Sequence, residues 1–174
     1  PPPIVCPTFY PTTLQTIYSR YPDQSTPPSR FFMLVRQGPT TFDIAMQVQF
    51  TGLPPNSSLC RLELLVPSPE QSAIQGPDPR FNVWAVEREE NATVTWETFE
   101  GSNHTSAPDQ ANPNATEDLN KAWKNERPLV VGELKCNETL TFQMGFAGDG
   151  GEEVNYWQFV DVSPPAVPAQ GWRV

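Results

Sequence analysis

The chain has 174 residues, 37% of them hydrophobic, and a formal net charge of −9 with a pI near 4.5. This size predicts one domain, and the acidity argues against nucleic acid or an anionic membrane as partners, because both require a positive field to offset phosphate charge. No apolar run reaches the roughly 18 residues of a membrane span, and residues 1–4 lack a signal-peptide pattern. We therefore expect the chain to be the mature form of the protein.

The first segment with a structural signal, residues 12–21, is ambiguous. Leu14, Ile17 and Tyr18 suit one face of a helix, but the β-branched and aromatic content equally suits an edge strand. We predict irregular structure or an edge strand there. The clearest signal follows at residues 42–50, where apolar and polar side chains alternate throughout. That period of two predicts a strand with one buried face.

Further short runs of strand-forming residues are separated by turn residues, and 21 prolines and 10 glycines lie mostly between the runs. The predicted strands are 31–36, 60–66, 81–87, 92–98, 129–136, 139–146, 154–162 and 172–174, with turns at 37–40, 52–56, 67–79 and 148–151. This organisation predicts an all-β fold: an antiparallel, jelly-roll-like β-sandwich spanning residues 1–174, with a Pro-rich N-terminal arm.

A long polar insertion at residues 99–127 breaks the strand pattern. Within it, Leu119, Ala122 and Trp123 have the i, i+3, i+4 spacing of an amphipathic helix, so we predict one short helix at 116–124. Trp123 is a candidate ligand-binding residue, because an exposed indole stacks on the apolar face of a sugar. The alternative is that its ring anchors the helix to the sandwich.

Three cysteines, Cys6, Cys60 and Cys136, leave one thiol over if a single disulfide forms. By strand alternation, Cys60 shares its face with Leu62 and Leu64, and Cys136 shares its face with Leu134. Both sulfurs are thus predicted to face the core, which favours a bridge between Cys60 and Cys136 that links strands across the fold. Pairing of Cys6 with either of the others stays open.

Five of the ten asparagines begin an Asn-X-Ser/Thr acceptor triplet, against about 1.4 expected by chance for this content of serine and threonine. The predicted glycosylation sites are Asn56, Asn91, Asn103, Asn114 and Asn137. We expect Asn91 and Asn137 on outward strand positions, and Asn103 and Asn114 in the insertion. The excess indicates the secretory pathway and marks surface positions, since a glycan must project into water.

Patterns for catalysis and metal binding are mostly missing. The single histidine, His104, lies inside an acceptor triplet, and no nucleophile elbow, zinc-protease or phosphate-loop motif is present. The strand acids Asp43, Glu63, Glu97 and Glu133 all fall on the polar phase of their strands, which predicts a solvated sheet face. Asp149, Glu152 and Glu153 could ligate calcium, but the glycines beside them equally suit a hairpin. We expect no cofactor, no metal and no catalytic residue.

Several segments carry a resemblance to a known family: 50–54 followed by 60–64, the strands with Trp84 and Trp96, the strand 135–137, and the closing 157–159 and 171–174. Together they resemble the C-terminal domain of the fungal ubiquitin-three-binding protein But-two, over about residues 9–174. The resemblance implies a secreted or wall-associated fungal β-sandwich without established catalytic residues. Cys6 and the insertion at 99–127 depart from that pattern.

Two classes of function follow from these observations. The first is a secreted, N-glycosylated, non-catalytic β-sandwich of the fungal wall or extracellular space, which binds polysaccharide or another secreted protein through a face free of glycans. The second is a glycan-active hydrolase with a carboxylate pair that has no sequence signature. The oligomeric state is left open.

Overall fold

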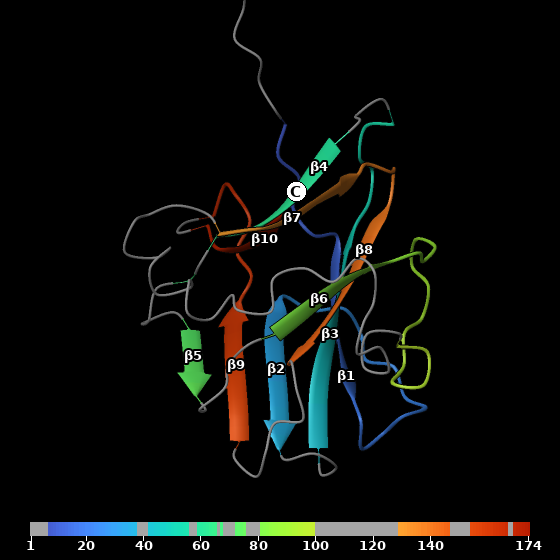
Figure 1. Ribbon diagram of the computed structural model, residues 1–174, viewed down its shortest axis with the longest axis vertical. Helices are drawn as coiled ribbons and strands as arrows, with labels where there is room; N and C mark the ends of the chain where they lie inside the picture. The colour runs from blue at the N-terminus through green and yellow to red at the C-terminus, as the bar shows by residue number, and fades with distance from the viewer. Residues whose placement is uncertain are drawn as a thin grey trace, which may run out of the picture.

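The computed structural model describes residues 7–37, 42–55, 59–65, 67, 72–75, 81–99, 129–146, 154–166 and 169–174 (Figure 1). Within them, every regular element is a β-strand and every strand pairing is antiparallel, which confirms the predicted all-β class. No helix long and apolar enough to cross a membrane occurs in this part of the chain. The strands are β1 Thr13–Tyr18, β2 Phe31–Gln37, β3 Phe42–Phe50, β4 Leu59–Leu65, β5 Ser72–Gln75, β6 Phe81–Val86, β7 Leu129–Lys135, β8 Leu140–Phe146, β9 Val154–Val160 and β10 Gly171–Arg173.

The strands form a seven-stranded sheet with the order β5-β9-β2-β3-β8-β6, to which β1 adds beside β3, and a three-stranded sheet with the order β10-β4-β7. The larger sheet branches along β3. At Ile44 the neighbours of β3 are β1 and β2, whereas at Met46 they are β1 and β8. Because a strand has two edges, β2 and β8 must share one edge of β3 and diverge from it. In Figure 1, β6 and β8 accordingly run at a steep angle to β5, β9 and β2.

Aromatic side chains from both branches and from the smaller sheet meet in one core. The ring centroids of Phe32 and Phe159 are 4.9 Å apart, those of Phe81 and Trp157 are 5.0 Å apart, and Trp172 of β10 lies 5.7 Å from Phe32. All five side chains are at least 98% buried. Rings of this size dominate the apolar area of a core, so this cluster holds the two branches of the larger sheet and the smaller sheet together.

The predicted disulfide between Cys60 and Cys136 is confirmed, with the two Cα atoms 5.1 Å apart. The sequence suggested that this bond links strands across the fold, but the structure shows that it does not. Cys60 of β4 pairs with Leu134 of β7, so the bond joins neighbouring strands of the smaller sheet. It still closes a long loop, with a sequence separation of 76 residues. Cys6 lies outside the described residues.

Phe9, near the first described residue, pairs with Val174, which follows β10. The backbone N–H of Phe9 donates to the carbonyl of Val174 over 2.8 Å, and the N–H of Val174 donates to the carbonyl of Phe9 over 3.0 Å. The described part of the Pro-rich N-terminal arm is therefore hydrogen-bonded to the last residue of the chain.

Two strand predictions need correction. Residues 92–98 do not form a strand: 92–95 have no regular secondary structure and 96–98 form a turn, in which the hydroxyl of Thr98 accepts a hydrogen bond from the N–H of Thr95 over 2.9 Å. Residues 72–75, assigned to a turn from their Pro-rich surroundings, form β5 as an edge strand. For the ambiguous segment 12–21, the edge-strand alternative is confirmed, because Thr13–Tyr18 pair with β3 alone among the named strands.

The prediction that β3 has a single buried face is wrong. Its apolar phase, including Met46 and Val48, faces the core, but Gln47 and Gln49 on the other phase are each 2% exposed. A second small cluster on that side contains Ala45 together with Val94 and Phe99 of the loop that follows β6. Residues far along the chain thus cover the polar side of β3.

Candidate functional site

The outward side chains of β2 and β9 form a sheet surface without charge. Phe32 and Leu34 of β2 and Trp157 and Phe159 of β9 point into the core, so alternation turns the residues between them outward. We call this surface the β2–β9 face; its members are Phe31, Met33, Val35, Gln37, Val154, Tyr156, Gln158 and Val160.

The register places the members of the β2–β9 face in rows across the two strands. Phe31 lies opposite Val160, and Met33 lies opposite Gln158. Phe31 is 36% exposed, Val154 is 47% exposed and Val160 is 48% exposed. None of the eight side chains is an acid, a base or an acceptor asparagine. Val35, in the middle of the face, is 7% exposed, so the exposed apolar side chains lie at its two ends. Exposed apolar side chains that lie side by side, as Phe31 and Val160 do, are typical of an interaction surface.

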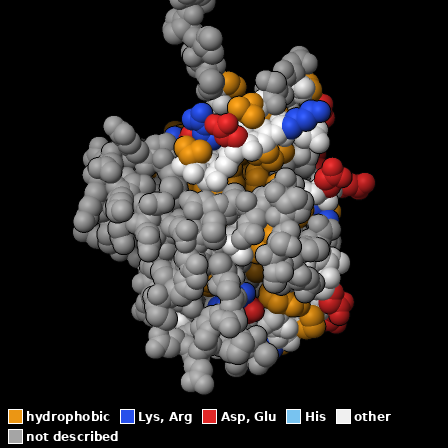
Figure 2. Space-filling model, in the orientation of Figure 1, with side chains coloured by type: hydrophobic (Ala, Val, Ile, Leu, Met, Phe, Trp, Pro, Cys, Tyr) orange, Lys and Arg blue, Asp and Glu red, His pale blue; other side chains and the backbone are white. Residues whose placement is uncertain are grey.

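The end of the molecule that carries β4, β7 and β10 has a different character. Figure 2 shows acidic and basic side chains next to one another there. Arg61 lies 3.2 Å from Glu133, and Arg173 lies 2.8 Å from Glu63. The Glu63 side chain is 18% exposed and that of Glu133 is 45% exposed. Glu133 is therefore on a solvated face as predicted, whereas Glu63 is largely buried in ion pairs.

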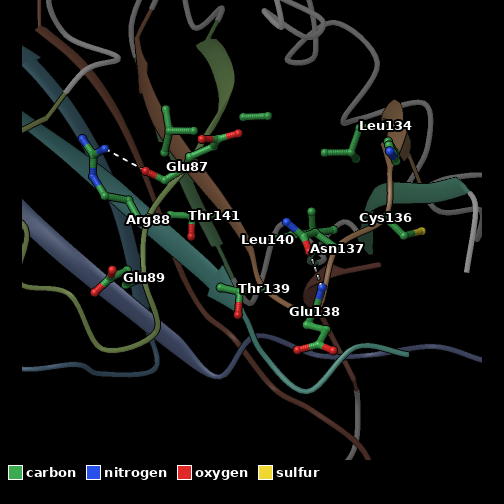
Figure 3. A pocket seen from close by; sticks show the side chains of 13 residues that line it. Glu87, Arg88, Glu89, Leu134, Cys136, Asn137, Glu138, Thr139, Leu140 and Thr141 are labelled. Carbon is green, nitrogen blue, oxygen red and sulfur yellow. Dashed lines mark hydrogen bonds between the residues drawn. The ribbon is translucent and has the colours of Figure 1, made fainter. Parts of the chain in front are cut away.

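A groove of about 930 Å³ opens between the two sheets (Figure 3). One side is made by the end of β6 and the residues after it, and the other by the end of β7, the turn that follows and the start of β8. Its charged lining residues are Glu87, Arg88, Glu89, Lys135 and Glu138. Figure 3 shows the three residues 87–89 on one side of the groove and Leu134 and Cys136 on the other.

Arg88 fixes the wall of the groove. Its Nη1 donates to the carbonyl of Glu87 over 2.9 Å, and its Nη2 donates to the carbonyl of Thr98 over 2.8 Å. The loop of residues 87–99, which covers one side of β3, is the covering loop. The second bond connects Thr98, near the end of this loop, to Arg88, near its start. The guanidinium is thus committed to the loop, while Glu87, Glu89 and Glu138 are exposed in the groove.

Asn91 and Asn137 are the acceptor asparagines that the structure describes, and both are exposed. Neither stands on a strand, contrary to the prediction. Asn137 follows β7, and its side-chain oxygen accepts a hydrogen bond from the N–H of Glu138 over 3.0 Å. Asn91 lies in a turn with φ of +62°, and its N–H donates to the Gln49 side chain over 3.4 Å. Asparagine tolerates this left-handed backbone better than most residues, so the turn explains the choice of residue.

Asp161 occupies the joint between β9 and β10, and sequence reasoning did not identify it. Its carboxyl is 1% exposed; Oδ2 accepts a hydrogen bond from the N–H of Trp172 over 3.0 Å, and Oδ1 lies 4.0 Å from Nη1 of Arg30. Burial raises the pKa of Asp161 to about 6, because desolvation outweighs the Trp172 hydrogen bond and the Arg30 charge. Gly171, at φ of +105°, has no room for a Cβ beside this carboxyl.

Asp43 also differs from the predicted solvated acid. Its side chain is 24% exposed and lies 3.5 Å from Nε of Arg36. Desolvation raises its pKa even though the Arg36 charge and hydrogen bond lower it. Glu97, the remaining strand acid, is exposed in the turn region that replaces its predicted strand.

Tryptophans Trp84, Trp157 and Trp172 are buried, as their strand positions predict, and Trp96 packs partly buried with its ring stacked 6.2 Å from Phe99. The described residues therefore contain no fully exposed indole for a sugar to stack on. Within the same residues, no group of three or more His, Cys, Asp or Glu side chains could hold a metal ion.

The remaining candidates lie outside the described residues. They are the acceptors Asn56, Asn103 and Asn114, the candidate Trp123 with its predicted helix, His104, and the predicted hairpin at 148–151.

Comparison with known proteins finds no matching family model, no matching curated protein and no matching solved structure.

Proposed function

We propose that this is a secreted, N-glycosylated β-sandwich that acts by binding another secreted protein through its β2–β9 face. The observation that carries the proposal is the combination of exposed Phe31, Val154 and Val160 on adjacent strands with the lack of charges and glycan acceptors on the face that they form. A glycan projects into water and would shield the surface beneath it, so a binding face has to be free of glycans.

The secreted compartment is supported by covalent chemistry. The Cys60–Cys136 disulfide persists in an oxidising environment, and the five acceptor triplets are several times more than chance gives. Both described acceptors, Asn91 and Asn137, are exposed, as modification requires. The resemblance to the But-two family adds a fungal, wall-associated setting to the proposal.

The chemistry of the face favours a protein over a polysaccharide as the ligand. Its exposed apolar members are two valines, Val154 and Val160, and one ring, Phe31, while Tyr156, the aromatic residue with a polar group, is only partly exposed. Polysaccharide platforms need exposed aromatic rings, and the described tryptophans are buried or packed. Protein interfaces, in contrast, have apolar centres depleted in charge.

Site-specific photo-crosslinking in a eukaryotic culture that secretes the protein tests the proposal. A photoreactive residue at Val160 should capture a defined secreted partner, whereas the same residue at Leu59, an exposed apolar side chain on the smaller sheet, should not. Equal capture at the two positions would show that the β2–β9 face is not special. A polysaccharide array, screened in parallel, tests whether the ligand is a carbohydrate. If the protein binds a polysaccharide and Val160→Arg abolishes that binding, the ligand of the face is a polysaccharide and not a protein.

A hydrolase is the second candidate, because Glu87, Glu89 and Glu138 line one groove. Glycosidases use two carboxyl groups about 5 to 9.5 Å apart. An assay for new reducing ends on the same polysaccharides tests this candidate. Turnover that is lost in Glu87→Gln, Glu89→Gln or Glu138→Gln, while the variant stays folded, would establish the hydrolase and overturn the binding function.

A further inference from the structure

The groove between the two sheets has an acceptor triplet built into its wall. Asn137, Glu138 and Thr139 all line it, and Figure 3 shows them beside Leu140 and Thr141. The hydrogen bond from the N–H of Glu138 engages Oδ1 of Asn137. This bond does not involve Nδ2, the atom that takes the sugar.

The lining of the groove matches the two kinds of surface that a sugar ring presents. Ala85, Leu134 and Leu140 offer apolar surface, while exposed Glu87 and Lys135 offer a carboxylate and an ammonium. A sugar has an apolar face and a rim of hydroxyls that both donate and accept hydrogen bonds. The volume of about 930 Å³ falls in the usual range of small-molecule sites, roughly 300 to 1,000 Å³.

We propose that the groove binds the first sugars of the chain's own N-linked glycan at Asn137, an inference that rests on the proposed function only in requiring glycosylation. The ligand is an N-acetylglucosamine core that is tethered in the wall, so its effective concentration in the groove is high without tight intrinsic binding. Because one wall comes from the end of β6 in the larger sheet and the other includes the end of β7 in the smaller sheet, the bound glycan bridges the two sheets. It also covers the three glutamates that a hydrolase would use.

Asn91 provides a matched control within the same molecule. It is exposed like Asn137, but it lies in a turn and does not line the groove. A glycan at Asn91 therefore starts outside this groove, and its core sugars stay in water. The two sites differ in the surroundings of the first sugar and not in the exposure of the asparagine.

The test is a time course of native deglycosylation with peptide-N-glycosidase F on protein secreted from a eukaryotic host, followed at each site by peptide mass spectrometry. We expect release from Asn137 to be at least about tenfold slower than from Asn91 in the native protein, because release requires local opening, and the two rates to converge after denaturation. Comparable native rates at the two sites would overturn the groove-bound glycan.

Two matched variants remove one glycan each without changing the asparagine. Thr139→Ala should increase hydrogen exchange in β6 and β7, the two walls of the groove, whereas Thr93→Ala should leave it unchanged. Unchanged exchange in both variants would contradict the inference. Mass analysis separates the two proposals. Sugar at other acceptor sites but none at Asn137 rejects this inference alone, whereas no sugar at any of the five acceptor sites rejects the secreted glycoprotein as well.

Discussion

The two branches of the large sheet have outer faces of opposite character. On the branch of β3 and β8, the outward residues Gln47, Gln49 and Gln143 are at most 2% exposed. On the branch of β2 and β9, Phe31 and Val160 at one end of the outer face are at least 36% exposed, although Val35 in its middle is 7% exposed. Polarity alone would predict the reverse. The difference shows that the covering loop, and not the strand sequence, decides which outer face meets water.

Hydrogen bonding makes the buried polar face possible. Nε2 of Gln143 donates to Oε1 of Gln47 over 3.1 Å, and Nε2 of Gln49 donates over 3.0 Å both to Oγ1 of Thr141 and to the carbonyl of Glu89. Burial of a polar group is costly unless such partners exist. The last of these bonds connects the sheet to the start of the loop that covers it.

The largest expected difference between the two branches comes from weakening the loop that covers β3. Phe99→Ala should lower the free energy of unfolding by about 3 to 5 kcal/mol, because the ring is 1% exposed over Ala45 and Ile17. Phe31→Ala, on the open branch, should cost less than about 1 kcal/mol. Urea unfolding of both variants measures the difference, and similar losses would mean that the two outer faces are equally buried.

A matched pair of glutamines sharpens the same contrast. Gln143→Ala deletes the donor to Gln47 and leaves a buried oxygen without this partner, so we expect a loss of about 2 to 4 kcal/mol. Gln158→Ala, on the β2–β9 face, should cost about 0.5 kcal/mol or less. Thermal and urea unfolding provide the values. A Gln143 variant as stable as the Gln158 variant would show that the hydrogen-bonded glutamines add nothing.

Asp161 is a buried carboxyl whose hydrogen bond and nearby charge do not fully offset the cost of its desolvation, in contrast to the hydrogen-bonded glutamines. Its pKa is about 6 when folded and 3.8 in its ordinary state, so between these pH values the folded chain binds more protons than the unfolded chain. The contribution of Asp161 to stability should therefore be largest below about pH 4 and decrease as the pH rises through about 6, by on the order of 3 kcal/mol at most.

Asp161→Asn removes this titration while keeping an oxygen that can accept from the N–H of Trp172. Its unfolding free energy should depend less on pH between about 4 and 7 than that of the unmodified protein. The raised pKa of Asp43 leaves a smaller slope of the same sign in the variant. An unchanged slope would show that Asp161 is ionised in the folded protein throughout this range.

The smallest expected effect on stability is on the β2–β9 face. Val160→Ala should change the unfolding free energy by about 0.5 kcal/mol or less, since nearly half of the side chain is exposed. If the face binds a partner, the same substitution should weaken that binding by roughly tenfold, as for a residue inside an interface. Titration against the crosslinked partner measures this. A large stability loss without a change in affinity would make Val160 a structural residue.

Much of the fold follows from local patterns in the sequence. Alternation over 42–50 predicts β3, and the phase of Cys60 and Cys136 predicts their disulfide, because side chains on a strand alternate whatever surrounds them. The acceptor triplets are equally local, and their number alone favours secretion. The triplets do not reveal that Asn91 and Asn137 lie off the strands, because that depends on where each strand stops pairing.

Other features depend on contacts between distant residues. Residues 92–98 alternate in polarity like a strand, yet they pack Val94 and Phe99 over β1 and β3 instead of pairing. The groove at Asn137 is lined by the end of β6 from one sheet and the end of β7 from the other, which are far apart in the sequence. Alternation records which side chains share a face of a strand. Which of those faces is covered is a property of the folded chain, because the cover is supplied by segments far away in the sequence.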